Sequence, residues 1–270
     1  MTSNRFYSSP SVHLLFIICL SFQVSICSAF TVIIDPGHGG ADVGAYKDGV
    51  KESQITLKVA EKLHSKISSL AEIKSLTTRS RDINLGLKER VDFAHEHKGD
   101  IFLSIHVNSS SDHRANGVEF YFQNQLEPDE AAEFLAHQES QLNVLQNSAT
   151  DSNALIRAGW SPALKTIFFD LLQQSRVQES FRLSKLLREN WNGHKKSKGN
   201  SIKQAPFHVV SQTQIPATLV ELGFLTNKKD FRSLRNETYL DQIVESIYQG
   251  LIEYKDSLNK DSFRQESPPL

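Results

Sequence analysis

The sequence predicts one α/β domain in which a twisted, mostly parallel sheet is flanked by helices on both faces. Short runs of apolar and β-branched residues alternate with longer segments whose apolar residues recur at helical spacing. The run at residues 100–108 is apolar enough for burial on both faces, which is typical of a parallel sheet. The first run, residues 31–34, passes directly into a glycine-rich loop, and open α/β sheets hold ligand sites where such loops leave their strands.

The first 29 residues are expected to lie outside this domain. Residues 1–13 are polar with one arginine and no acidic residue, residues 14–26 are mostly apolar, and residues 27–29 are small enough for cleavage. This order is typical of a secretory signal peptide, with Phe30 as the first residue after cleavage. The apolar run falls short of the ~20 residues of a membrane span, so a retained anchor is the less favoured alternative and no stable span is expected after cleavage.

Composition narrows the class of protein. The chain has 270 residues and a formal net charge of −1, so charge gives no reason to expect binding to nucleic acid. Both cysteines, Cys19 and Cys27, fall in the predicted signal peptide, so the exported protein is expected to have no disulfide and no thiol nucleophile. The catalytic domain is predicted at residues 30–258, and a flexible tail at 259–270.

The first half of the domain is predicted as a series of strands and helices around a histidine loop. Asp35-Pro-Gly ends the first strand, and His38 follows among glycines that let the backbone turn sharply. Apolar residues at helical spacing predict a helix that opens near Glu52. The elements that follow are a strand at 72–78, a helix at 85–94 and the strand at 100–108.

The second half is predicted to complete the sheet around an insertion. Residues 117–122 resemble a strand at a sheet edge, whereas residues 123–164 are acidic, helical and then polar, which indicates an insertion that covers or borders the site. A long amphipathic helix follows at 168–191. The remaining predicted elements are strands at 207–210 and 217–220 and helices at 228–235 and 239–258.

Two histidines and two glutamates are expected to meet at one edge of this sheet. His38 follows the first strand, and alternation along residues 100–108 puts Ser104, His106 and Asn108 on one side of the third. Glu221 follows a late buried strand, where an unpaired carboxylate would be costly to bury. Glu52 lies at the start of the first helix, where a carboxylate that only favours the helix dipole is the simpler explanation.

Two chemistries stay open on these residues alone. Two histidines and one carboxylate are a usual catalytic zinc set, and a second carboxylate could act as the general base for hydrolysis. No His-Glu-x-x-His helix is present, so the short zinc-protease signature is missing. A phosphate-binding protein that uses the glycine loop is the alternative, although the loop lacks a following Gly-Lys-Ser/Thr.

Five segments, in order, resemble the zinc-dependent N-acetylmuramoyl-L-alanine amidases of the AmiC type. The resemblance covers about residues 30–254, and the segments are Val-Ile-Ile-Asp-Pro-Gly-His-Gly-Gly at 32–40, Lys-Glu at 51–52, Leu-Thr-Thr-Arg at 76–79, Leu-Ser-Ile-His-Val-Asn at 103–108 and Pro-Ala-Thr-Leu-Val-Glu-Leu-Gly-Phe-Leu-Thr-Asn at 216–227.

The resemblance implies an activity and the residues that carry it. It implies that His38, Glu52 and His106 bind one Zn²⁺ per chain and that Glu221 is the catalytic carboxylate. The reaction would cleave the amide between N-acetylmuramic acid and L-alanine in peptidoglycan or its muropeptide precursors. Such an enzyme acts in cell-wall remodelling and daughter-cell separation, which agrees with a periplasmic or otherwise exported location.

Further residues are expected to act around this centre. Arg79 and Asn108 either orient the substrate or the zinc ligands, or have a purely structural part. In some relatives the segment that corresponds to 123–164 places a glutamate on the zinc, so Glu133 and Glu139 are candidates for autoinhibition. An activator protein is a further expected partner. Many relatives carry an additional wall-targeting domain that is not evident in this sequence.

Two rival functions use the same sequence differently. One is a non-catalytic module that binds peptidoglycan with the same fold. The other is a serine-type stem-peptide carboxypeptidase, because Ser257 and Lys260 fit Ser-x-x-Lys. That match lies at the end of the last predicted helix, where it is expected to arise by chance.

Overall fold

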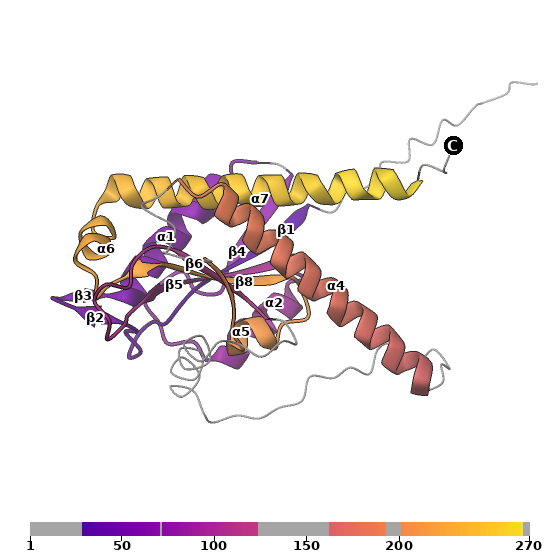
Figure 1. The fold of residues 1–270 in the computed structure, drawn as a ribbon, viewed down its shortest axis with the longest axis horizontal. Helices are drawn as coiled ribbons and strands as arrows, with labels where there is room; N and C mark the ends of the chain where they lie inside the picture. Colours follow the sequence, from indigo (N-terminus) through magenta and orange to yellow (C-terminus); the bar gives the residue numbers. More distant parts are fainter. Residues whose placement is uncertain (1–28, 71, 124–161, 193–200, 267–270) are drawn as a thin grey trace, which may run out of the picture.

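The computed structural model describes residues 29–70, 72–123, 162–192 and 201–266. Its centre is a six-stranded sheet with helices on both faces, which confirms the predicted α/β architecture (Figure 1). The strand order is β4–β1–β5–β8–β6–β7. The strands are β1 (Phe30–Pro36), β4 (Ile73–Thr77), β5 (Ile101–Asn108), β6 (Glu119–Phe122), β7 (Ile202–Gln204) and β8 (Ala217–Phe224).

The sheet is parallel in one half and reversed in the other. Strands β4, β1, β5 and β8 all pair in parallel, so their carboxyl ends meet at one edge. Strand β6 is antiparallel to β8, and β7 is parallel to β6. A short hairpin of β2 (Tyr46–Lys47) and β3 (Val50–Lys51) lies between β1 and the first helix.

The helices divide between the two faces of the sheet. The face that we call the helix face is covered by α1 (Glu52–Ile67), α4 (Pro162–Glu189) and α7 (Glu237–Glu266), whereas α2 (Leu87–Glu96) and α5 (His208–Ser211) cover the other, which we call the site face (Figure 1). The short helix α6 (Lys228–Ser233) follows β8. Alternate residues of each strand enter two cores: Leu103 and Val220 pack on the helix face, and Phe102 and Leu219 on the site face.

Four details of the predicted fold are wrong. Strand β6 is not at the edge, because the unforeseen strand β7 pairs outside it. Residues 207–210 do not form a strand: the amide groups of Val210 and Ser211 both donate to the carbonyl of Phe207, which begins α5. Helix α4 begins at Pro162, inside the range predicted as insertion. Helix α7 continues to Glu266, past the helix end predicted at residue 258.

Across the described residues, no helix has both the length and the apolar character that crossing a membrane requires. All but the last residue of the predicted signal peptide and most of the predicted insertion lie outside the described residues.

Candidate metal centre

The loop after β1 presents His38 in an uncommon backbone conformation. His38 has a φ of 58°, in the left-handed region that side chains other than glycine rarely adopt. The turn is closed by a pair of hydrogen bonds between the backbones of Gly39 and Asp42. Asp42 also reaches back, and its carboxylate lies 2.9 Å from Nδ1 of His38. A strained residue held from several sides is typical of a functional site.

The first residue of α1, Glu52, reaches from the helix face to the carboxyl edge of the sheet. Its Oε2 accepts a hydrogen bond from the amide of Ala45 at 2.8 Å, and its Oε1 accepts one from the amide of Val107 at 2.8 Å. The side chain is only 2% exposed. Burial alone would raise the pKa of Glu52, but the charges of His38 and His106 and their side-chain hydrogen bonds outweigh burial and hold the pKa below its ordinary value.

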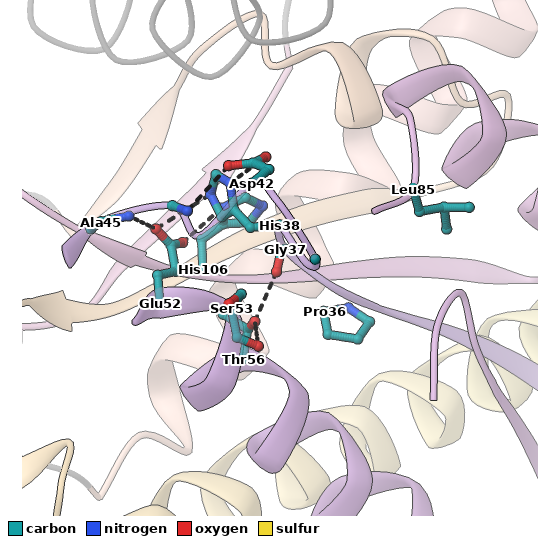
Figure 2. Close-up of polar contacts among 12 residues, drawn as sticks. Pro36, Gly37, His38, Asp42, Ala45, Glu52, Ser53, Thr56, Leu85 and His106 are labelled. Carbon is teal, nitrogen blue, oxygen red and sulfur yellow. Dashed lines mark hydrogen bonds and ion pairs between the residues drawn. The ribbon is translucent and has the colours of Figure 1, made fainter. Parts of the chain in front are cut away.

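Both histidines approach this one carboxylate. Nε2 of His38 lies 3.3 Å from Oε2 of Glu52, and Nδ1 of His106 lies 3.0 Å from its Oε1. The two imidazole rings are 5.0 Å apart between centroids and nearly perpendicular. Figure 2 shows the three side chains converging, with Asp42 next to the ring of His38. One ligand atom from each of the three residues lies within 4.8 Å of the others, so the sequence prediction that they come together is confirmed.

Two glycines make room for these rings. A Cβ on Gly37 would come within 2.5 to 2.8 Å of the ring of His106. A Cβ on Gly44 would lie 2.5 Å from Oε2 of Glu52 and 2.6 Å from the ring of His38, and Gly44 has a φ of +62°. The glycine-rich loop is therefore required by the close approach of three side chains, which explains it without a bound phosphate.

Asp42 is a candidate functional residue that the sequence analysis missed. Burial would raise its pKa, but the hydrogen bond and charge of His38 and the amide of Gly44 hold the pKa below its usual range. A carboxylate on the outer nitrogen of a metal-binding histidine fixes the ring and its tautomer. An acidic residue four positions after the histidine, within a glycine loop, was the signal that could have found it.

Arg79 is hydrogen-bonded to backbone carbonyls on both sides of the candidate centre. Its guanidinium donates to the carbonyls of Pro36 (2.9 Å), Gly37 (2.7 Å) and Ser53 (3.0 Å) and is only 2% exposed. It therefore joins the His38 loop to the first turn of α1, next to Glu52. Burial, followed by the nearby charge of Arg90, lowers the pKa of Arg79 to about 10. Of the predicted alternatives, these contacts favour orientation of the candidate ligands over direct contact with substrate.

A second buried arginine completes this support. Arg90 on α2 pairs with the fully buried carboxylate of Asp35 at 2.6 Å and donates to the carbonyls of Pro36 (2.7 Å) and His38 (2.9 Å). Asp35 also accepts hydrogen bonds from the hydroxyl groups of Thr78 and Ser104. The sequence analysis assigned no role at the site to Asp35 or Arg90. Their contacts hold the backbone on both sides of Gly37.

Glu221 lies beside His106, within β8. The two residues are register partners on adjacent parallel strands, so their side chains lie on the same face, and Glu221 is 1% exposed. Next to it on β6 is Glu119, its antiparallel partner and a second buried carboxylate, which the sequence analysis did not single out. Asn108 contacts Glu119 through its side-chain nitrogen at 3.5 Å. The contact that places Asn108 is thus one with the carboxylate of Glu119.

The remaining predicted residues do not join the centre. Glu133 and Glu139 lie outside the described residues. Ser257 is near the far end of α7, where its hydroxyl donates to the carbonyl of Tyr254 at 2.7 Å, and Lys260 is exposed on the same helix. Nothing in this pair resembles a nucleophile beside a base.

Comparison with known proteins agrees with this geometry. The family described as N-acetylmuramoyl-L-alanine amidase matches residues 32–253. The amidase AmiA of Escherichia coli K12 is 33% identical over 227 residues, which are 83% of this chain and 75% of that protein. AmiC of Escherichia coli O6:H1 is 29% identical over 83% of this chain and 52% of that protein. The crystal structure of an N-acetylmuramoyl-L-alanine amidase from Clostridium difficile 630 is 28% identical, with a TM-score of 0.62, over 85% of this chain and 98% of that one.

Proposed function

The chain belongs to the N-acetylmuramoyl-L-alanine amidase family, and from this premise we propose that it is a zinc-dependent hydrolase of the amide between N-acetylmuramic acid and L-alanine in peptidoglycan. The observation that carries the proposal is the buried group of His38, Glu52 and His106, whose ligand atoms lie within 4.8 Å of one another. Two imidazole nitrogens and one carboxylate oxygen are the donor set of many catalytic zinc sites, in which a further position stays open.

The nitrogen–oxygen separations are compatible with zinc. Nε2 of His38 lies 3.3 Å from Oε2 of Glu52, and Nδ1 of His106 lies 3.0 Å from Oε1, each close to the ~3.3 Å expected between two ligands about 2.0–2.1 Å from a tetrahedral ion. Asp42 would orient His38 through Nδ1 and leave Nε2 for the metal. When bound, zinc would polarise the substrate carbonyl and lower the pKa of water, which is the chemistry that amide hydrolysis requires.

Glu221 is the residue that we assign to proton transfer. It would accept a proton from the attacking water and deliver it to the nitrogen of L-alanine as the amide breaks. Its position supports this, because it is buried beside His106 on the next strand.

We further propose that the protein acts outside the cytoplasm, in the remodelling of the cell wall and in daughter-cell separation. The polar, apolar and small residues of segment 1–29 support export, and the substrate class of the family lies outside the cytoplasm. Autoinhibition through Glu133 or Glu139 and the need for an activator protein stay predictions.

A digest of purified muropeptides tests the activity. We expect mass spectrometry to detect free stem peptides beginning with L-alanine together with peptide-free glycan. A chelator should abolish these products, and stoichiometric zinc should restore them. A protein that binds peptidoglycan and zinc but releases no peptide would be a non-catalytic module. Product formation that persists after complete metal removal would contradict the zinc proposal.

A further inference from the structure

A row of polar side chains extends from the metal centre to the edge of the sheet. On the site face, His106 of β5 is in register with Glu221 of β8, which is in register with Glu119 of β6. Tyr121, two residues beyond Glu119, is in register with Lys203 of the edge strand β7. Register partners and residues two apart point to the same face of a sheet. The side chain of Lys203 therefore lies on the same face of the sheet as the candidate catalytic residues.

Glu119 fixes the position of Lys203. An oxygen of Glu119 lies 2.8 Å from Nζ of Lys203, and its other oxygen accepts a hydrogen bond from the hydroxyl of Tyr121 at 2.7 Å. Carboxylates directly opposite one another on adjacent strands repel, so the Glu119–Glu221 pair is unfavourable without a compensating cation. Lys203 supplies that cation, and the stem of its side chain is held with Nζ 5.8 Å from the centre of the Tyr121 ring.

Lys203 is nevertheless partly accessible. Its side chain is 26% exposed, whereas that of Glu119 is only 7% exposed. An ammonium group has three donors, so an ion pair with one carboxylate leaves capacity for a second acceptor that arrives from solvent. Because Glu119 already restrains the lysine, binding such an acceptor would order few additional rotamers.

The spacing along the row suits the substrate proposed above. Strands β8 and β7 are separated by two strand intervals, or roughly 10 Å at ~4.8 Å each. An extended peptide advances about 3.3–3.6 Å per residue. If the cleaved amide lies at Glu221, the second residue of the stem peptide therefore lies about 7 Å further along the substrate. The flexible side chain of Lys203 can span the remaining distance of roughly 3 Å between that residue and β7. In a stem peptide that residue carries either a carboxylate or its carboxamide.

We propose that Lys203, anchored by Glu119, is a specificity-determining residue that binds the carboxylate of the second stem-peptide residue. This inference rests on the proposed function, because it takes the muramoyl amide to lie at Glu221. The chemical class of ligand is an acidic peptide whose carboxylate follows the cleaved bond by one residue. The substrate with a carboxamide at that position loses the charge that Lys203 would recognise.

The inference can be tested with two muramyl dipeptides. They differ only in the second residue, which carries a carboxylate in one and a carboxamide in the other. Their affinities are measured by calorimetry on zinc-loaded Glu221→Gln protein, which does not consume them. We expect the carboxylate form to bind about five- to tenfold more tightly, the range of a partly exposed charged hydrogen bond. Lys203→Met should equalise the two affinities, and Lys203→Arg should retain the preference.

A matched control and a separate activity assay make the outcomes distinct. Lys88→Met removes a lysine that pairs with Asp92 on α2 and should leave the preference unchanged. Equal affinities without any lysine change, or a preference that survives Lys203→Met in protein with full zinc content, would overturn the inference. If Lys203→Met fails to fold, the inference is decided by whether protein that retains Lys203 binds the carboxylate dipeptide more tightly than the carboxamide dipeptide. Failure of the wild type to hydrolyse either dipeptide would count against the proposed function, while the binding preference is measured independently.

Discussion

The two faces of the sheet use the same strands for opposite purposes. Along β5, Leu103, Ile105 and Val107 enter the apolar core beneath α1, α4 and α7. Their alternate neighbours Ser104 and His106 are buried on the site face, where they contact carboxylates. One strand thus supplies packing on one face and chemistry on the other.

The difference also concerns charge. On the helix face, the charged pairs of α1 and α7 lie at the solvent boundary, as in Lys66–Glu245, with both side chains more than a third exposed. On the site face, Asp35 and Arg90 are paired while fully buried or nearly so. Burying charges is expensive and contributes little net stability compared with apolar packing. The site face therefore carries groups that stability alone does not require, and changes to the two faces should have separable effects.

The largest effect is expected for His38→Ala and Glu221→Gln. Loss of His38 removes one of three candidate ligands, so both zinc and activity should be lost.

Glu221→Gln should keep the zinc and lower kcat by about 10²–10⁴-fold, the usual contribution of a general acid–base. Metal analysis and muropeptide hydrolysis on the same preparations measure both. A Glu221→Gln protein that has lost its metal would place this residue among the ligands instead.

Arg90→Met should have the largest effect on stability. It leaves the carboxylate of Asp35 buried without its cation, which costs about 3–5 kcal/mol in comparable cases. It also removes the donor to the carbonyl of His38, so zinc affinity should fall. Chemical denaturation and chelator competition measure the two quantities. The double variant Asp35→Asn/Arg90→Met should be less destabilised than the sum of the single changes; strict additivity would show that the pair is not coupled.

Leu103→Ala tests the helix face in the same strand. Removal of a fully buried leucine side chain should lower the free energy of unfolding by about 2–5 kcal/mol. Zinc affinity, kcat and KM should stay at wild-type values, because Leu103 faces away from the site. Catalytic constants that fall in proportion to stability would refute the separation of the two faces.

Acid should weaken the protein through Asp35. Burial would raise its pKa, but the charge of Arg90 and hydrogen bonds from Thr78, Arg90 and Ser104 outweigh burial and hold the pKa below 3.8. A carboxyl whose folded pKa is depressed stabilises the fold above its unfolded pKa, and this contribution is lost as pH falls through the folded pKa. Unfolding of metal-free protein between pH 5 and pH 2 should therefore show a shallower decline for Asp35→Asn than for wild type. Parallel curves would contradict this.

The sequence predicted those parts of the fold that depend on local pattern. The buried strand before His38 and the alternation of Ser104, His106 and Asn108 were readable because apolar periodicity follows burial directly. Residues 207–210 were mistaken for a strand, because four residues are too few to distinguish periods of 2 and 3.6. Strand β7 was missed because it has only three residues, of which Ile202 alone has a high β propensity, and because it depends on pairing with β6.

The site was predictable only where a residue type suggested chemistry. The histidines and both glutamates stood out, and the family resemblance favoured Glu52 as a zinc ligand over a carboxylate that only favours the helix dipole. Arg79 was ambiguous, because the same guanidinium could contact substrate or, as found, backbone carbonyls. The sequence analysis did not single out Glu119 and Lys203, because their pairing depends on the register of β6 with its neighbouring strands. The register between two segments that are distant in sequence cannot be predicted from either segment alone.

The smallest effect is expected for Glu245→Gln, which breaks the 2.7 Å ion pair with Lys66 at the boundary of the helix face and leaves Lys66 over the ring of Tyr248. Exposed pairs of this kind contribute less than about 1 kcal/mol, and at 1 M salt the Debye length of ~3 Å should remove even that. Denaturation of wild type and Glu245→Gln at 0.05 and 1 M salt measures the difference. The destabilisation caused by Arg90→Met should persist at both salt concentrations, because ions do not reach a buried pair. If salt abolished the two losses equally, the charges of the site face would be no more sheltered than those at the helix surface.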